Sequence, residues 1–367
     1  MKILIYISRI VIGIVFIFSG IVKAIDPLGS AYKFHDYFQA FHIDFLKFIS
    51  LPLSILLFTA EFIAGFSVLT GLRQKTGIWG VLILMLIFTP LTFILALTNP
   101  VTDCGCFGDA IHLTNWQTFW KNIILLLFVI ILFINRKSIH SNLRIMTEWI
   151  IISGAIVIIV LFSLFNLRYL PVIDFLPYKI GVNIPENMII PEGAPADEYY
   201  TTFIYEKNGV KQEFTLDNYP ANDTTWRFVD QKSRLVKKGY HPPIHDFMIT
   251  TLNNVDITQR ILSDTGYTVL MISRKIEEAD SVNLQKGFEL GYYLNRTSTS
   301  FYILTSSGSD EVNKFDNALQ FCHMDDTTLK TMMRANPGYL LIKNGTIVGK
   351  WSWANVPEKV AFTDPGH

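Results

Sequence analysis

Long apolar stretches separated by short polar breaks fill the first 167 residues of the chain. A helix needs about 20 mostly apolar residues to cross the hydrocarbon core of a membrane. Five stretches reach or approach that length: residues 3–22, 48–70, 77–97, 118–134 and 149–167. The pattern therefore predicts five membrane-spanning helices. Because the first stretch runs into Lys23 with no clear small-residue cleavage site, it is interpreted as an uncleaved signal-anchor.

The second half of the chain has short segments with strand and helix patterns, as in a soluble α/β domain. A Pro-rich linker with a hairpin signal at Asn208-Gly209 covers residues 168–244. Beyond it, strands and helices alternate before a closing hairpin signal at Asn344-Gly345. The strands are expected at residues 268–273 and 300–305, and the helices at 280–294 and 310–319. This order predicts a small mixed sheet with helices on both faces.

Charge divides the chain at the same place. The first 166 residues hold 18 charged side chains, and the remaining 201 hold 44. We expect a four-helix transmembrane domain, a cytoplasmic loop with a fifth span, a linker region, a soluble domain and a tail: residues 1–135, 136–167, 168–244, 245–355 and 356–367. Basic and acidic residues are equal at 31 each, which argues against nucleic acid as a partner.

Basic residues set the expected orientation, because they concentrate in cytoplasmic loops. Arg73 and Lys75 follow the second stretch, and three more basic residues lie at 136–144, whereas residues 98–115 contain none. The amino terminus is therefore expected in the cytoplasm, and five crossings place everything after residue 167 outside. The expected location is a bacterial inner membrane, with the soluble domain in the periplasm.

The most specific chemical signal is DCGCFGD at residues 103–109, in the loop without basic residues. Cys104 and Cys106 can approach disulfide distance because Gly105 allows the bend. So small a ring is strained and more oxidising than a structural bridge, which favours a redox pair in an oxidising compartment. A structural staple and a metal site are the alternatives. The further ligands that a metal could use nearby are Asp103, Asp109 and His112, a thin set, so we expect none.

The two acidic neighbours also bear on thiol reactivity. Asp103 and Asp109 are expected to raise the pKa of both thiols by like-charge repulsion, which disfavours the thiolate. A pair with this property stays oxidised and acts as a donor of disulfides.

Three segments together resemble a known family. They are RIVIGIVFIFSGIVKAIDP, AEFIAGFSVLTG and DCGCFGD, and they look like the DoxX and MauE group of four-helix bacterial membrane proteins, over about residues 1–135. MauE-type proteins are associated with methylamine metabolism and with maturing a disulfide-rich periplasmic amine dehydrogenase. The DoxX side is linked to quinone. The resemblance thus implies a thiol-redox role with a periplasmic client, and a quinone as candidate cofactor where no other is evident.

The closing part of the chain, about residues 245–355, resembles the thioredoxin fold. Pro337 stands where that family keeps a cis-proline, which predicts a cis bond from Asn336, and IKNG occupies the usual hairpin. The family's Cys-x-x-Cys is replaced here by Ser-Arg-Lys-Ile-Glu-Glu at residues 273–278. The resemblance therefore implies a redox-dead docking domain.

Charged side chains inside spans are costly and suggest function. Glu61 lies near the middle of the second stretch and Arg9 lies within the first, so each is a candidate counter-ion of the other; a purely structural pair is the alternative. Lys23 is interpreted as an ordinary snorkelling side chain. Three further pairs are interpreted as core, loop and packing residues rather than catalytic ones: Cys322 with His323, His241 with His245, and Trp351 with Trp353.

Two hypotheses follow. In the first, Cys104 and Cys106 exchange disulfides with a periplasmic client, as a thiol-disulfide oxidoreductase would, and the membrane bundle passes the electrons onward. In the second, the chain is a non-enzymatic anchoring or assembly factor whose thioredoxin-like domain binds a partner.

Overall fold

The computed structural model describes residues 2–101, 103–137, 143–221, 223–297, 299–315, 318–358 and 362. It forms two compact units. One comprises Met1–Val182 together with Met248–His367, and the other comprises Asn183–Phe247. The first unit contains all five predicted spans and the predicted soluble domain.

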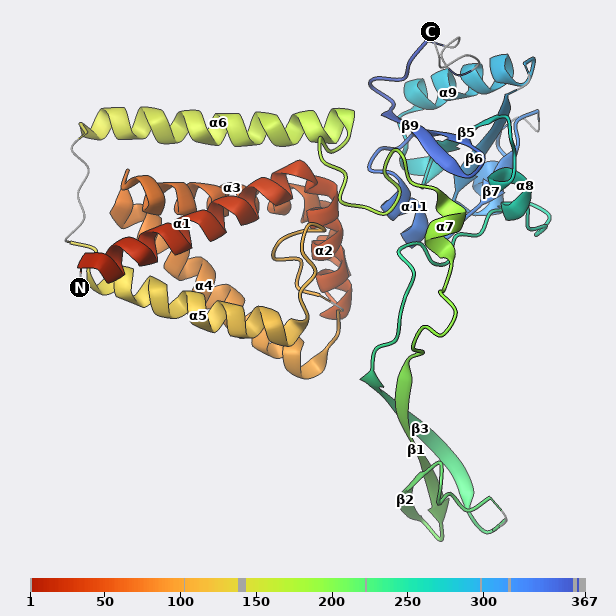
Figure 1. Ribbon diagram of the computed structural model, residues 1–367, viewed down its shortest axis with the longest axis horizontal. Coiled ribbons are helices and arrows are strands. Elements are labelled where there is room, and N and C mark those ends of the chain that lie inside the picture. The colour runs from red at the N-terminus through yellow and green to blue at the C-terminus, as the bar shows by residue number, and fades with distance from the viewer. Residues whose placement is uncertain are drawn as a thin grey trace. The chain divides into compact units, whose positions relative to one another are not determined.

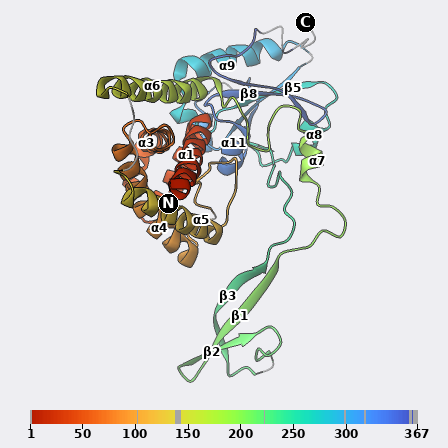
Figure 2. The same ribbon diagram turned by 60° about the vertical axis from the view of Figure 1, so that its left-hand side comes forward.

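Five helices of the first unit are long and apolar enough to cross a membrane (Figures 1 and 2). They are α1 (Lys2–Ile25), α3 (Ser50–Thr70), α4 (Gln74–Thr98), α5 (Asn115–Ile134) and α6 (Ile145–Tyr169). A 3-10 turn, Asp44–Ile49, leads into α3. All five predicted stretches form such helices. Four of the helices extend past the predicted stretch at one or both ends, whereas α3 begins two residues later than predicted.

Small residues let α1 and α3 pack closely. A Cβ atom added at Gly20 of α1 would lie 2.7 Å from the Cβ of Phe62, and one added at Gly65 of α3 would lie 2.7 Å from the Cβ of Phe16. Close approach at small residues is a usual way for helices to associate in membranes. The contact fixes the register of the two helices, which decides the partners of the charged residues they carry.

An additional helix, α2 (Pro27–Ala40), was not predicted. It begins directly after α1, where the Asp26 side chain accepts a hydrogen bond from the Gly29 amide at 2.9 Å and Pro27 occupies the first turn. A capping aspartate followed by proline is a typical helix start. Helix α2 packs against α3 and supplies part of the site described below.

The soluble part of the first unit is built on a six-stranded sheet of order β4-β7-β6-β5-β8-β9. Strands β5, β6 and β7 are parallel, whereas β8 runs antiparallel to β5 and β9 antiparallel to β8. The strand bounds are β4 Thr250–Thr251, β5 Tyr267–Ile272, β6 Ser300–Thr305, β7 Phe321–His323, β8 Gly338–Lys343 and β9 Thr346–Ser352. The predicted mixed sheet is confirmed, and the Asn336–Pro337 bond is cis as predicted.

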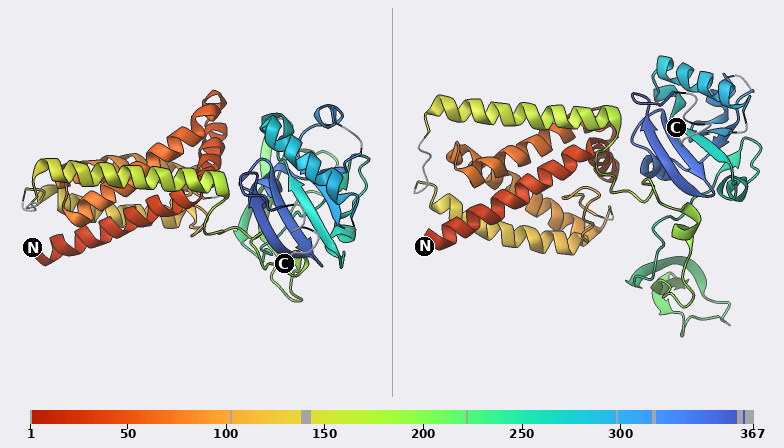
Figure 3. Two further views of the ribbon diagram at one scale, coloured as in Figure 1. Left: turned by 90° about the horizontal axis from the view of Figure 1, so that it is seen from above. Right: turned by 45° about the horizontal axis from the view of Figure 1, so that its top comes forward.

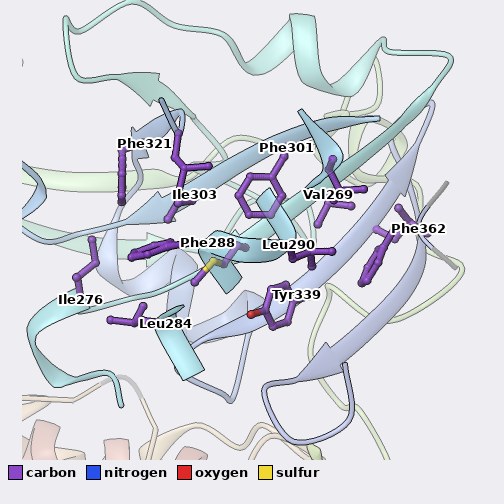
Figure 4. Close-up of a cluster of buried hydrophobic side chains, with 14 of the residues drawn as sticks. Val269, Ile276, Leu284, Phe288, Leu290, Phe301, Ile303, Phe321, Tyr339 and Phe362 are labelled. Carbon is purple, nitrogen blue, oxygen red and sulfur yellow. The ribbon is translucent and has the colours of Figure 1, made fainter. Parts of the chain in front are cut away.

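The helices of this part are α8 Thr258–Leu262, α9 Ser281–Leu294, α10 Ser309–Val312 and α11 Asp326–Met332, with a 3-10 turn at Ile276–Glu278. Helix α9 begins at its Asp280 cap and lies over the sheet (Figure 3). Its Phe288 and Leu290 meet alternate strand residues such as Val269 and Phe301 in one apolar cluster (Figure 4). Helix α10 ends sooner than predicted, and residues 316–317 of that prediction lie outside the described residues.

The second unit contains α7 (Ile184–Met188) and a three-stranded antiparallel sheet of order β2-β1-β3. The strands are β1 Glu198–Lys207, β2 Val210–Thr215 and β3 Arg227–Lys237. The predicted hairpin is confirmed, and its turn residues Asn208 and Gly209 both have positive φ, as a two-residue hairpin turn requires. Strand β3 was not predicted, because it is exposed along its whole length and so lacks an apolar alternation.

Candidate thiol site

The loop between α4 and α5 brings its two cysteines together. The Sγ atoms of Cys104 and Cys106 lie 2.9 Å apart as free, half-buried thiols. The turn between them depends on glycine, because Gly105 has φ +64° and an added Cβ would lie 2.9 Å from the Lys33 side chain. A residue with a side chain at that position would be strained and would push the loop from α2.

Helix α2 holds this loop from one side. Tyr37 donates a hydrogen bond to the Cys104 carbonyl oxygen at 2.6 Å, and Lys33 forms an ion pair with Asp103 at 2.9 Å. Asp103 in turn accepts a hydrogen bond from the Gly105 amide at 2.9 Å. The backbone around the thiols is therefore fixed by side chains that lie about 70 residues earlier in the chain.

A buried ion pair holds the loop from beneath. Lys23 of α1 lies 2.7 Å from both carboxylate oxygens of Glu61 in α3, and their side chains are only 8% and 3% exposed. The Ser19 hydroxyl lies 2.9 Å from Glu61 Oε2 and 2.7 Å from the Cys106 carbonyl oxygen. Glu61 thus belongs to the site, as the sequence suggested. Its cation is Lys23, so the interpretation of Lys23 as a snorkelling side chain is wrong.

The predicted pairing of Glu61 with Arg9 is wrong. Arg9 donates instead to the backbone carbonyl oxygens of Val68 and Leu69, at 3.1 Å each, near the carboxyl end of α3. Helices α1 and α3 are antiparallel neighbours, so the residues level with Arg9 belong to the end of α3, whereas Glu61 is level with Ser19 and Lys23. Arg9 therefore has no part in the thiol site.

A cavity of about 110 Å³ in the bundle lies beside the thiols. Its polar wall includes the two cysteines with Lys23, Glu61 and Lys121. Its apolar wall is formed by side chains from the bundle helices and α2: Val15, Phe16, Phe34, Leu57, Met85, Phe88, Leu91 and Leu125. The Lys121 ammonium lies 4.4 Å from the centre of the Phe107 ring. Lys121 and Leu125 also border a hollow lined by Trp116 and Trp120, whose side chains are largely exposed.

The pKa values of the two thiols are shifted in opposite directions. A hydrogen bond from Cys104, assisted by the positive charges of Lys121 and Lys23, lowers the pKa of Cys106 to about 6. The same hydrogen bond, together with burial, raises the pKa of Cys104 well above its usual value. Cys106 is thus the thiolate of the pair, and Cys104 carries the shared proton.

The expectation that acidic neighbours raise the pKa of both thiols is wrong for Cys106. Asp103 is neutralised by Lys33, and Asp109 is bound by Arg334, whose Nη2 lies 2.8 Å from Asp109 Oδ2. A carboxylate that is already paired with a cation exerts little net repulsion on a neighbouring thiol. The positive charges of Lys121 and Lys23 instead lower the pKa of Cys106.

The other candidates lie outside this arrangement. His112 is exposed and 4.0 Å from Asp103, and among the described residues no group of three His, Cys, Asp or Glu side chains could hold a metal ion. Cys322 is a buried core residue of β7, and this burial raises the pKa of its thiol to about 12. His241 contacts Asp197, at 3.0 Å. The two tryptophans pack, Trp351 against the Phe362 ring and Trp353 beside the Arg168 guanidinium.

Several residues of the site were missed by sequence reasoning: Ser19, Lys33, Tyr37, Lys121 and Arg334. The Asp26-Pro27 start signal would have revealed α2, and with it the helical face that carries Lys33 and Tyr37. Arg334 gave no signal, because its partners come from distant parts of the chain.

The five helices define a multi-pass membrane protein. Comparison with known proteins finds a family model that matches this part: the model described as Methylamine utilisation protein MauE matches residues 1–135. The MauE side of the resemblance inferred from the sequence is thereby confirmed over that stretch. A second model, a domain of unknown function (DUF8463), matches residues 199–238 in the second unit. No curated protein and no solved structure matches the chain.

Proposed function

We propose that the protein carries out thiol-disulfide exchange at the outer face of a bacterial inner membrane, using Cys104 and Cys106. The observation that carries this proposal is a pair of thiols 2.9 Å apart, one of lowered pKa, on the wall of a cavity within the bundle. A stabilised thiolate favours the reduced form of a pair, and this makes the corresponding disulfide a stronger oxidant. The pair is therefore suited to giving disulfides to a client.

The reaction balances as a two-electron exchange. A client thiolate attacks the Cys104–Cys106 disulfide at one sulfur, and Cys106 is the better leaving group because of its lower pKa. The mixed disulfide on Cys104 is resolved by the second client thiol, which leaves an oxidised client and two reduced cysteines. These cysteines return to the disulfide when a two-electron acceptor takes two electrons and two protons. A quinone held by the apolar wall of the adjoining cavity would supply that chemistry.

The soluble domain has the part of a docking module in this proposal. Its thioredoxin-like character is supported by the order β6-β5-β8-β9, with β5 and β6 parallel and β8 antiparallel, and by the cis Pro337 before β8. Ser273 stands at the end of β5 where that fold carries its redox motif, and it is fully buried. The contact of Arg334 with Asp109 supports a location of this domain on the same side of the membrane as the thiol loop. The basic residues of the other loops favour the periplasm as that side.

Thiol labelling tests the proposal. Membranes containing the full chain are treated with maleimide-polyethylene glycol before and after reduction at graded potentials. We expect Cys104 and Cys106 to be protected until the sample is reduced, and to be released at a potential above about −300 mV, where structural disulfides resist reduction. Cys104→Ser and Cys106→Ser should each abolish function. Cys106→Ser keeps the cysteine that carries the mixed disulfide but removes its partner thiol, so this variant should trap mixed disulfides with the client.

The matched control is Cys322→Ser, which removes the remaining cysteine of the chain from a buried position outside the site. It should leave labelling of the pair and function unchanged. If both loop thiols are free at rest, or if function survives their double replacement, the redox proposal is refuted. The anchoring or assembly factor would then be the better account.

A further inference from the structure

The arginine that binds Asp109 comes from the soluble domain, just after helix α11. Arg334 is only 6% exposed and makes two ion pairs with the membrane bundle, Nε with Asp26 Oδ2 and Nη2 with Asp109 Oδ2, both at 2.8 Å. Its guanidinium also lies 5.3 Å from the centre of the Tyr32 ring. An arginine fork that holds two carboxylates gives orientation as well as attraction.

Both carboxylates belong to elements that hold the thiols. Asp109 lies three residues after Cys106 in the same loop, next to Gly108 with its positive φ. Asp26 caps the first turn of α2, the helix whose Lys33 and Tyr37 bind the cysteine loop. One guanidinium thus connects the carboxyl side of the loop to the start of the helix that supports it.

From this geometry we propose that Arg334 is a positioning residue for the thiol pair, through which a domain without redox cysteines sets the reactivity of Cys104 and Cys106. The inference rests on the proposed function for its biological meaning, but its physical content is a coupling between Arg334 and the loop. Without the guanidinium, Asp26 and Asp109 are left as two buried carboxylates close to each other, and their repulsion moves the loop away from α2. The sulfur–sulfur contact then loosens, and Cys106 loses the hydrogen bond that stabilises its thiolate.

This role explains the fusion of the two parts in one chain. A separate redox domain would need its own cysteines to act on the pair, whereas a positioning domain needs only a rigid platform for one side chain. The platform is present, since Arg334 lies between two buried parts of the domain: Met332, the last residue of α11, with Met333, and strand β8. Its backbone is therefore held by the sheet core.

The experiment measures alkylation of each cysteine by mass spectrometry in the reduced, full-length protein, over a range of pH. In Arg334→Gln, we expect the midpoint for Cys106 to rise by about one pH unit or more. Arg334→Lys should recover part of this shift, because it restores the charge without the two-pronged geometry. The matched control is Arg260→Gln, an exposed arginine of the same domain, which should leave the midpoint unchanged.

Cys322 provides an internal test of folding, because it is buried in the sheet of the soluble domain. It should stay unlabelled in Arg334→Gln if the domain remains folded. Should it become labelled, Asp109→Asn serves instead, since it keeps the Arg334–Asp26 pair and breaks only the link to the loop. A Cys106 midpoint within about 0.3 pH units of the native value, with Cys322 protected, overturns the positioning role.

The two proposals fail in different ways. If the thiols prove to have no redox function but the Cys106 midpoint still follows Arg334, the coupling stands and the proposed function falls. If the pair is redox-active and its midpoint ignores both Arg334→Gln and Asp109→Asn, the proposed function stands and the positioning role falls.

Discussion

The lowered pKa of Cys106 makes a prediction that can be tested without knowing a client. With a pKa of about 6, roughly 90% of Cys106 is thiolate at pH 7, against about 3% for an ordinary cysteine of pKa near 8.5. The gain in thiolate is about 30-fold. Because nucleophilicity falls as the pKa falls, with a Brønsted slope of about 0.4–0.5, most of this gain is lost and the rate at pH 7 rises only about two- to threefold.

The diagnostic quantity is therefore the midpoint of the pH profile rather than the rate at one pH. Alkylation of reduced Cys106 by iodoacetamide should reach half of its plateau near pH 6 and be lost as the pH falls below that value, because protonation removes the thiolate. Cys104→Ala deletes the donated hydrogen bond and should move the midpoint up toward 8.5. Cys322→Ala, the matched control, should not move it. A native midpoint near 8.5, or one that ignores Cys104→Ala, would refute the shared-proton description of the pair.

Three further predictions concern the frame and the topology. Lys23→Met should destabilise the bundle by about 3–5 kcal/mol in denaturation assays in detergent, whereas the double variant with Glu61→Met should recover most of the loss; additive effects would contradict a coupled pair. Tyr37→Phe should cost about 1–2 kcal/mol in the same assay, through its lost hydrogen bond to the loop carbonyl, and a neutral result would remove α2 from the frame. Alkaline phosphatase fused after residue 355 should be active and a green fluorescent protein fusion dark; the reverse pattern would overturn a periplasmic soluble domain.

The elements of the fold were largely readable from the sequence because each has a strong local period. The spans are uniformly apolar over the thickness of a membrane, and strands β5 and β6 are continuous apolar runs, as expected where a sheet is buried on both faces. Helix α2 was missed because it has neither property: it is mixed in polarity and follows α1 after one residue. Its capping signal was present but short.

The thiol pair was identified from its spacing, but its partners were not. Charges inside spans drew attention to Glu61 and Arg9, and the choice between possible cations depended on the register of two helices. That register is set by close contacts at glycines such as Gly20 and Gly65. The depth of a residue along its own helix gives no information about these contacts. A lysine near the end of a membrane helix usually extends its ammonium group to solvent, which is why the sequence predicts an ordinary snorkelling side chain at Lys23. In the structure, the Glu61 carboxylate lies at the same level and keeps Lys23 buried.

The pKa of Cys106 is lowered and not raised for the same reason: its charged neighbours come from distant parts of the chain. Read along the chain, DCGCFGD places two acidic residues around two thiols, and like-charge repulsion is the natural expectation. In three dimensions Lys33 and Arg334 each neutralise one of these carboxylates, so the net field at Cys106 comes from the lysines of the cavity wall. Repulsion from the acids would have kept the pair oxidised by making its thiolate costly. The observed arrangement stabilises the thiolate instead. Under the proposed function, this makes the disulfide a stronger oxidant of a client, and an acceptor is then needed to form the disulfide again.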